Sequence, residues 1–156
     1  MPEVKDILVK VFLEVAEQMA FLFGEEADED ALCGLARDIR VVKMCFKGPF
    51  FGTLTLVATS DLCHILAENM LGVDADDERA VSKALDAVKE LLNVTCGRVL
   101  TAVAGEVPVF DLTVPEVLPV LPAEVHALKE CGEFAVCLLE EDHTVLLIVK
   151  IEPANH

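Results

Sequence analysis

The sequence lacks most of the features that mark a membrane, secreted or nucleic-acid-binding protein. Its longest apolar runs, such as residues 145–149, are far too short to cross a bilayer. Near the start, Lys5, Asp6, Lys10 and Glu14 interrupt the apolar residues, which argues against a signal peptide. Only 12 basic residues stand against 28 acidic ones, and the net charge of −16 repels phosphate backbones and anionic lipids. We therefore expect a cytoplasmic protein that binds neither nucleic acid nor a membrane.

Residues with metal-ligand spacing are missing as well. The four histidines are scattered, and no two of the six cysteines form a C-x-x-C pair. The cysteines are Cys33, Cys45, Cys63, Cys96, Cys131 and Cys137. We interpret them as buried, reduced thiols of a cytoplasmic protein. The sequence therefore predicts no metal site and no cofactor held by this chain.

The apolar residues that are present suffice for one well-packed domain. The chain has 156 residues, of which 54% are hydrophobic, so we expect a single domain over residues 1–156. The spacing of apolar residues predicts helices over 3–23, 60–72 and 80–104. Alternation of apolar and polar residues predicts two hairpins, one over 39–58 with its turn at 48–49, and one over 134–151 with its turn at 140–143. A proline-rich stretch, 107–122, is expected to run extended over the surface or along a sheet edge. This order predicts an α+β fold: a mostly antiparallel sheet with long helices packed on one face.

Glycines and acidic clusters indicate where the elements end. Gly24, Gly72 and Gly105 are expected to stop the three helices, and Ser60 or Asp61 to cap the second one. Acidic residues gather at three places: 25–30, 74–78 and 140–142. We expect all three clusters in solvated loops and turns, and the second also places negative charge near the start of the long helix.

The long helix, 80–104, has two different faces. A rotation of about 100° per residue predicts a core stripe of apolar residues. Its members are Val81, Leu85, Val88, Leu92, Cys96, Val99 and Val103. On the opposite side, Asp86, Glu90, Asn93 and Gly97 fall within about 60° of one another.

This polar stripe has two interpretations. Any amphipathic helix has a polar face, and acidic residues such as Asp86 and Glu90 are expected there. Asn93 and Gly97 are less favourable in the middle of a helix, because each has a lower helix propensity than Ala; for Gly the difference is about 1 kcal/mol. Such a conflict between local propensity and fold often marks a functional or closely packed site. Gly97 removes side-chain bulk beside Asn93, so that a partner's backbone or phosphate could approach.

The pattern Asp86-x-x-x-Glu90-x-x-Asn93 followed by Gly97 resembles the signature of the CheC/CheX/FliY chemotaxis phosphatases, which carry an acidic residue or Ser, then Glu, then Asn on a long exposed helix. Three further stretches resemble the same family: residues 47–56 its hairpin, 67–72 the helix end that precedes the motif, and 87–97 the motif helix. The order of elements fits over nearly the whole chain.

The resemblance implies hydrolysis of the aspartyl phosphate on a receiver protein such as phosphorylated CheY. Asn93 and Glu90 would be the catalytic pair: Asn93 would orient the attacking water, and Glu90 would contact the receiver's active-site lysine. Asp86 and Gly97 would contact the partner. Magnesium would belong to the receiver, not to this chain. Cys96 lies towards the core stripe, which argues against a nucleophilic role.

A second copy of the motif is incomplete. Lys10, Glu14 and Glu17 of the first helix stand at the matching positions, with Glu17 in place of the Asn, and whether the two halves are a true duplication is open. One intact site resembles CheX, whose members are typically dimers joined through their sheets, so the resemblance implies a homodimer. The main alternative function is a non-catalytic adaptor that binds a receiver or another signalling protein through the same helix or its sheet. A metal-dependent hydrolase has no ligand cluster in this sequence.

Overall fold

The computed structural model describes residues 3–74 and 76–153. The helices are α1 (Val4–Ala20), α2 (Ser60–Leu71), α3 (Ala80–Ala104) and the short α4 (Val125–Lys129), with two 3-10 turns, η1 (Glu29–Leu35) and η2 (Pro122–Glu124). The strands are β1 (Gly24–Ala27), β2 (Ile39–Lys47), β3 (Phe50–Thr59), β4 (Asp111–Leu112), β5 (Glu116–Leu118), β6 (Glu133–Leu139) and β7 (His143–Pro153).

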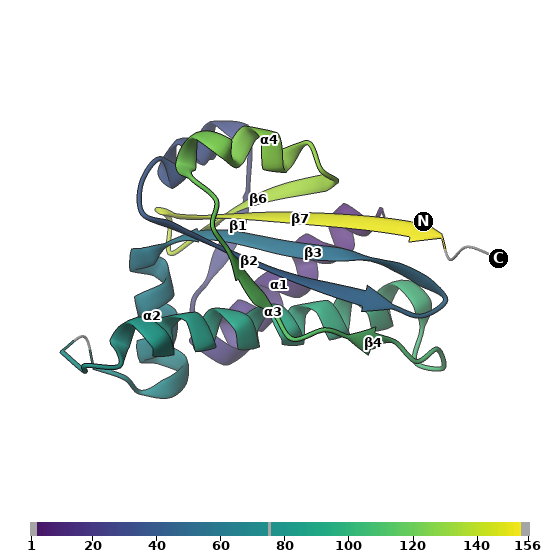
Figure 1. Ribbon diagram of the computed structural model, residues 1–156, viewed down its shortest axis with the longest axis horizontal. Helices are drawn as coiled ribbons and strands as arrows, with labels where there is room; N and C mark the ends of the chain where they lie inside the picture. Colours follow the sequence, from purple (N-terminus) through teal and green to yellow (C-terminus); the bar gives the residue numbers. More distant parts are fainter. Residues whose placement is uncertain (1–2, 75, 154–156) are drawn as a thin grey trace.

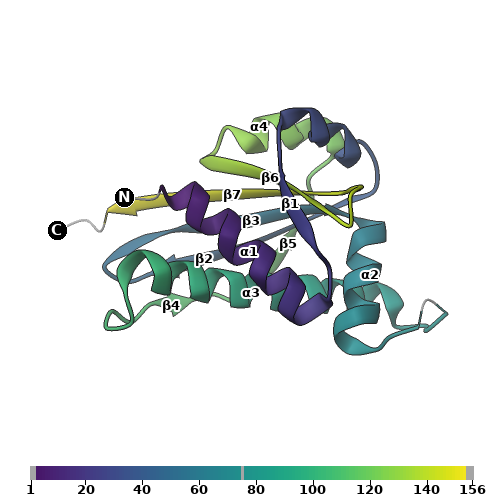
Figure 2. The ribbon, with the colours of Figure 1, turned by 180° about the vertical axis from the view of Figure 1, so that it is seen from behind.

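All paired strands are antiparallel and belong to one sheet. Their spatial order is β1-β6-β7-β3-β2-β4, and β5 pairs with β2 beside β4. The long helices α1 and α3 lie on one face of this sheet, whereas α4 lies on the other (Figures 1 and 2). This arrangement confirms the predicted α+β fold with its mostly antiparallel sheet.

Side chains on the two faces of the sheet form two separate cores, because successive residues of a strand point to opposite sides. On β2, Val42, Met44 and Phe46 pack in the large core under α1, α2 and α3. Val41, between them in sequence, belongs to a smaller core that includes residues of η1 and α4. The long helices therefore cover one face, as predicted, while short pieces cover part of the second.

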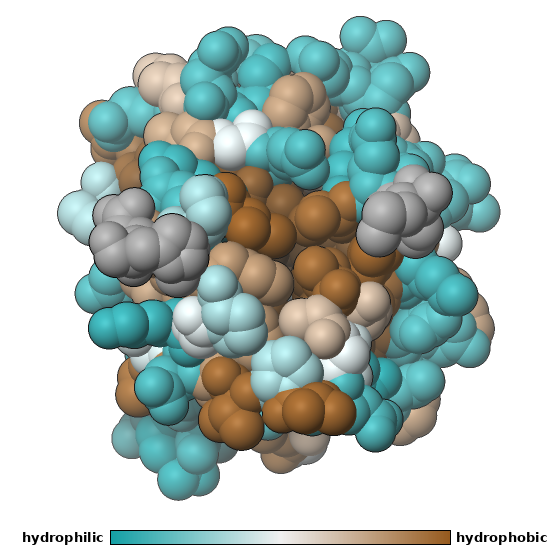
Figure 3. Space-filling model, turned by 90° about the vertical axis from the view of Figure 1, so that its right-hand side faces the viewer, coloured by the Kyte–Doolittle hydropathy of each residue, from teal (hydrophilic) through white to brown (hydrophobic). Residues whose placement is uncertain are grey.

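At one end of the molecule the large core reaches the surface. Figure 3 shows apolar side chains gathered at the end where β7 finishes. The gap between sheet and α3 near this end, bounded by Phe46, Val99 and Ile151 among others, measures only about 10 Å³. A space of that size is at the lower limit for one water molecule, so the layer is closed to ligands.

The first helix is shorter than its apolar spacing predicts. It ends at Ala20, and Phe21 follows in the left-handed region at φ 58°, so Gly24 is not the stop residue. Gly24 instead begins β1, where a Cβ would lie only 2.5 Å from the carbonyl oxygen of Leu138. The glycine is needed for this close approach to β6 rather than for ending the helix.

The acidic cluster 25–30 was predicted as a solvated loop, and this is wrong for its first half. Glu25 and Glu26 lie in β1, which pairs with β6. Asp28 then caps η1 by accepting a hydrogen bond from the backbone N–H of Asp30 at 3.0 Å. Apolar and polar residues do not alternate here, because β1 is an exposed edge strand. Charged side chains are common on such edges, where they discourage pairing with other chains.

The remaining elements follow the sequence more closely. Both hairpins and the extents of α2 and α3 match the predicted ranges to within two residues, and Gly72 ends α2 in the left-handed conformation. Thr59, rather than Ser60 or Asp61, caps α2 through its hydroxyl. The proline-rich stretch 107–122 runs along the β2 edge of the sheet as β4 and β5. The short α4 was not predicted.

Candidate functional site

The candidate site lies on α3, and the two ends of this helix are fixed by local bonds. Before the helix, the Asp77 carboxylate accepts a hydrogen bond from the backbone N–H of Arg79 at 2.8 Å, which lowers the pKa of Asp77. At the far end Gly105, at φ 86°, donates its N–H to the carbonyl of Thr101 at 2.8 Å. The cluster 74–78 thus precedes the helix instead of entering its first turn.

The buried face of α3 is rotated relative to the predicted core stripe. Val88, Leu92, Cys96 and Val99 are buried as predicted. Val81, however, is 60% exposed, and Leu85 and Val103 are only half-buried. The other buried positions are Ala80, Ala84, Ala87, Leu91, Thr95 and Leu100. Three of these positions are alanines, which an expectation based on large apolar side chains underweights.

The polar stripe is on the solvent side of α3. Asp86 and Glu90 are exposed, and Asn93 and Gly97 are half-buried. Spacings of four, three and four residues place them side by side along the helix. The structure therefore brings all four predicted site residues onto one accessible face.

These side chains are not engaged within the chain. In the described residues, the side-chain hydrogen bonds from the middle and end of α3 are made by Thr95, Arg98 and Thr101. None of the side-chain hydrogen bonds or ion pairs among the described residues involves Asp86, Glu90 or Asn93. Their polar atoms can therefore bind a partner or a water without first breaking an internal bond.

Gly97 opens a hollow beside the stripe. A Cβ placed on Gly97 would meet no atom within 4 Å outside its own helix backbone. The hollow measures about 180 Å³, and Gly97, Leu100 and Thr101 form its wall on the helix. Phe110 forms part of the opposite wall, and its ring packs on that of Phe50 with centroids 5.0 Å apart. Packing within the domain therefore does not demand a glycine at this position.

The first helix runs beside α3 on the same face of the sheet (Figure 2). Arg98 of α3 donates a hydrogen bond to the Gln18 side chain of α1 at 2.6 Å. Lys10, Glu14 and Glu17, the positions that match the motif, are all exposed. The two polar stripes thus lie on neighbouring helices and face solvent.

The cysteines divide into two groups. Cys63, Cys96 and Cys137 are buried, and burial raises the pKa of each thiol to about 12. Cys33 and Cys131 are exposed and Cys45 is half-buried, so the prediction of buried thiols is wrong for these three. The raised pKa and burial of Cys96 support the view that it is no nucleophile, because the reactive thiolate is disfavoured there.

The described residues offer neither a metal-ligand cluster nor a membrane-spanning helix. Within them, no three His, Cys, Asp or Glu side chains are grouped so as to hold a metal ion. No helix of this part of the chain has the length and apolar character needed to span a bilayer.

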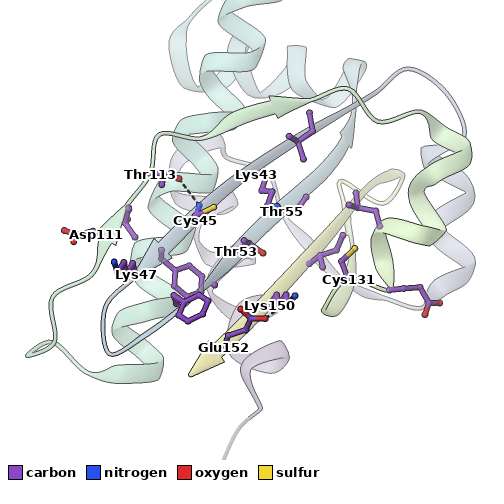
Figure 4. A pocket seen from close by; sticks show the side chains of 18 residues that line it. Lys43, Cys45, Lys47, Thr53, Thr55, Asp111, Thr113, Cys131, Lys150 and Glu152 are labelled. Carbon is purple, nitrogen blue, oxygen red and sulfur yellow. Dashed lines mark hydrogen bonds and ion pairs between the residues drawn. The ribbon is translucent and has the colours of Figure 1, made fainter. Parts of the chain in front are cut away.

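Sequence reasoning missed a large groove of about 1030 Å³ on the face of the sheet opposite α3 (Figure 4). Its floor carries Lys43, Cys45 and Lys47 from β2 and Thr53 and Thr55 from β3. The signal was the alternation within the first hairpin, which places polar residues on one side of both strands. Such alternation usually marks a solvated face, so no groove could be inferred from it.

Several solved structures share this fold. They include a chain of the CheX–CheY–BeF3–Mg²⁺ complex from Borrelia burgdorferi, with a TM-score of 0.67 and 13% identity over 96% of this chain and 98% of that chain. CheX from Vibrio vulnificus matches with a TM-score of 0.69 and 16% identity over 97% of both chains. FliY from Thermotoga maritima matches with a TM-score of 0.55 and 14% identity over 99% of this chain and 91% of that one. At these identities the likeness shows the fold.

The sequence itself identifies the family. No curated protein sequence matches the chain. The family described as chemotaxis phosphatase CheX matches residues 41–137, which include most of β2, all of β3, α2 and α3, and most of β6. The match covers more than half of the chain, and the chain belongs to the CheX family of chemotaxis phosphatases.

Proposed function

We propose that this protein hydrolyses the aspartyl phosphate of a CheY-like receiver. The observation that carries the proposal is the pair of Glu90, exposed, and Asn93, half-buried, on the solvent side of α3 of a CheX-family chain, with neither side chain bonded within the described residues. The similar fold in the CheX–CheY complex from Borrelia burgdorferi supports a receiver as the partner. In the reaction, a bond forms between water oxygen and phosphorus, the bond from phosphorus to the aspartyl oxygen breaks, and the products are inorganic phosphate and the free aspartate.

Asn93 is the residue we assign to the water. Its carboxamide both donates and accepts hydrogen bonds and carries no charge. It can hold a water in line with the phosphorus without repelling the phosphoryl oxygens, as a carboxylate would. Phosphoryl transfer depends mostly on positioning and electrostatic stabilisation, so one well-placed amide can contribute much of the acceleration.

The other stripe residues bind the partner. Glu90 contacts the active-site lysine of the receiver and so orients Asn93 within the receiver's site. Asp86 contacts the receiver at the edge of the interface, and the bare backbone at Gly97 admits the receiver's backbone. The magnesium ion belongs to the receiver, where it neutralises phosphoryl charge; this chain contributes no ligand to it.

The test is the decay rate of a phosphorylated CheY-like receiver in the presence of a small molar fraction of this protein. Wild type should shorten the phosphate lifetime with many turnovers per molecule, and Asn93→Ala should remove the acceleration. Ser82→Ala, an exposed change near the start of the same helix, is the matched control and should behave as wild type. Full acceleration by Asn93→Ala would contradict the assignment.

The same assay separates a phosphatase from an adaptor. An adaptor binds the phosphorylated receiver in stoichiometric amounts and leaves the lifetime of its phosphate unchanged. Binding without turnover by wild type would therefore replace the phosphatase proposal with the adaptor. With neither binding nor turnover, the assay is repeated with the other receivers of the same genome before the phosphatase proposal is rejected.

We also propose that the protein forms a homodimer through the β4–β5 edge of its sheet. Six of the ten large apolar side chains that are exposed in the described residues lie between 107 and 121. Val107, Val109 and Val114 are 92%, 81% and 83% exposed. An apolar sheet edge favours pairing with another chain, and a two-fold pairing of two copies would cover both edges at once.

Sedimentation velocity at several concentrations tests the dimer. Wild type should sediment as a dimer, and Val109→Glu together with Val114→Glu should give a monomer. Val81→Glu changes an exposed valine far from the edge in sequence and should leave the dimer intact. A dimer that survives the paired change, or a wild-type monomer at all concentrations, would overturn this arrangement.

A further inference from the structure

The groove on the second face of the sheet has the construction of a small-molecule site. Its floor is formed by β2, β3 and β7, one rim by the β4–β5 segment, and the other by α4 and the residues after it (Figure 4). The volume of about 1030 Å³ is that of a pocket for a drug-sized ligand. Neither Glu90 nor Asn93 lines it, so the groove is separate from the proposed phosphatase site.

Thr55, a buried residue in the floor, has a hydroxyl without a partner in the described part of the chain. Three polar side chains of the described residues are buried: Thr55, Thr95 and Thr144. Thr95 donates to the carbonyl of Leu91 at 2.7 Å, and Thr144 donates to that of Ala31 at 2.8 Å. Thr55 is only 4% exposed and makes no hydrogen bond among the described side chains.

The Thr55 hydroxyl is open to the groove. No side-chain polar atom of the described residues is both fully buried and without a partner. The small exposed part of Thr55, which lines the groove, therefore includes its hydroxyl oxygen. Hydroxyls of buried residues normally have a partner. Because this hydroxyl has none within the described residues, it is free to bond a group that enters the groove.

Lys43 lies beside this hydroxyl. It stands directly opposite Thr55 in the β2–β3 register, so both side chains leave the sheet on the same side. Lys43 is half-buried and forms no ion pair within the described part of the chain. Lys150 of β7 forms an ion pair with Glu152, with 3.3 Å between its Nζ and the carboxylate oxygen. Among the described residues, Lys43 and Lys47 are thus the lysines of the floor without an ion pair, and Lys43 is the half-buried one of the two.

Among the described residues, no carboxylate forms an ion pair with Lys43. Glu116 is opposite Lys43 in the β2–β5 register but is exposed and not bonded to it. The Asp111 carboxylate points away from the floor in Figure 4. A half-desolvated ammonium without a carboxylate favours an anionic ligand.

Apolar side chains complete the lining. Phe51, Leu118, Leu128 and Ile148 surround the polar centre. They can bury a hydrocarbon body while the charged group bonds Lys43 and Thr55.

We propose that this groove binds a small organic anion with an apolar body, its anionic group held between the Lys43 ammonium and the Thr55 hydroxyl. The groove and α3 are on opposite faces of the sheet, so the ligand and a receiver can be bound together. The proposal does not depend on the phosphatase activity and can be tested without a receiver.

Isothermal titration of the full chain with decanoate tests the site, with decan-1-ol as the uncharged probe of equal chain length. Wild type should bind one decanoate per chain, and decan-1-ol more weakly. Lys43→Met should weaken decanoate binding roughly 10-fold or more, because a hydrogen bond to a charged group is lost, with little effect on decan-1-ol. Lys83→Met, a half-buried lysine on α3, is the matched control and should bind as wild type.

The Thr55 variants separate binding from folding. Thr55→Val keeps the shape and should weaken decanoate binding, whereas Thr55→Ser keeps the hydroxyl and should restore it. No binding by wild type would overturn the proposal, as would equal binding of decanoate and decan-1-ol, or decanoate binding unchanged in Lys43→Met and Thr55→Val. Decanoate binding that appears only on dilution from dimer to monomer would also overturn it, because a second copy would then occupy the groove.

Discussion

The helices α1 and α3 lie on the same face of the sheet and expose polar stripes of the same spacing, yet only one has the features of a site. On α1 the stripe is Lys10, Glu14 and Glu17, and on α3 it is Asp86, Glu90 and Asn93. Both keep the central glutamate. They differ at the first position, Lys10 against Asp86, and at the third, where the amide of Asn93 is present only on α3.

The position after the stripe differs as well. Four residues beyond Asn93 the helix continues through Gly97, where a side chain would meet nothing. Four residues beyond Glu17 the helix has ended, and Phe21 stands 68% exposed. The matching position of α1 therefore carries a bulky exposed ring where α3 carries no side chain. Exposure of a polar stripe is common to both helices, and the amide with its open approach is what distinguishes the candidate site.

The largest effect is expected from making α3 resemble α1. Asn93→Glu should abolish receiver dephosphorylation, a loss of roughly 100-fold or more, because the carboxylate repels the phosphoryl oxygens and cannot donate to the water. The decay rate of the phosphorylated receiver measures it, with Ser82→Ala as control. Retained activity in Asn93→Glu would show that the amide is not the difference between the helices.

The next effect concerns the glutamate that the helices share. Glu90→Gln should raise KM for the phosphorylated receiver roughly 10-fold and lower kcat less, because a charge-assisted contact with the receiver's lysine is lost. Glu14→Gln on α1 is the matched control and should change neither constant. Equal losses in the two variants would assign the docking role to both helices.

Gly97 should show opposite effects on stability and activity. Gly97→Ala should raise the free energy of unfolding by up to about 1 kcal/mol, because alanine is the better helix former and its methyl group meets no neighbour. The same change should raise KM, since the methyl group stands where the receiver approaches. Urea denaturation and the decay assay measure the two effects. A variant that is more stable and fully active would remove the argument for approach at Gly97.

The smallest effect is expected from completing the motif on α1. Glu17→Asn in the Asn93→Ala background should restore no activity, because Phe21 still blocks the approach and the helix ends three residues after position 17. The decay assay measures it. Restored turnover would show that the amide alone is sufficient, and that the open approach at Gly97 is not needed.

Much of the fold could be predicted because apolar spacing and turn residues agreed with the tertiary structure. The long helix 80–104 and both hairpins are examples. The errors lie where tertiary contacts override local pattern. Gly24 was interpreted as a helix stop but is a close contact between strands, and β1 has no apolar alternation because it is an exposed edge.

The candidate site was predictable for a different reason. Asn93 and Gly97 oppose helix formation in the middle of a helix, and that conflict is visible in the sequence. The roles of these residues, in contrast, were inferred from the resemblance to a family. Helical spacing alone shows only that the residues share one face of the helix. The groove over Lys43 and Thr55 could not be predicted, because it depends on two rims, β4–β5 and α4, that are distant in sequence from its floor.

The central claim is that Asn93 contributes to the chemical step and not to docking. The most direct measurement determines, for wild type and Asn93→Ala, both the affinity for a receiver held in its phosphorylated form by beryllium fluoride and the rate of receiver dephosphorylation. Asn93→Ala should bind this receiver with an affinity close to that of wild type, and the receiver should lose its phosphate no faster with Asn93→Ala than alone. A variant that dephosphorylates at the wild-type rate once the receiver is saturating, and differs only in affinity, would contradict it.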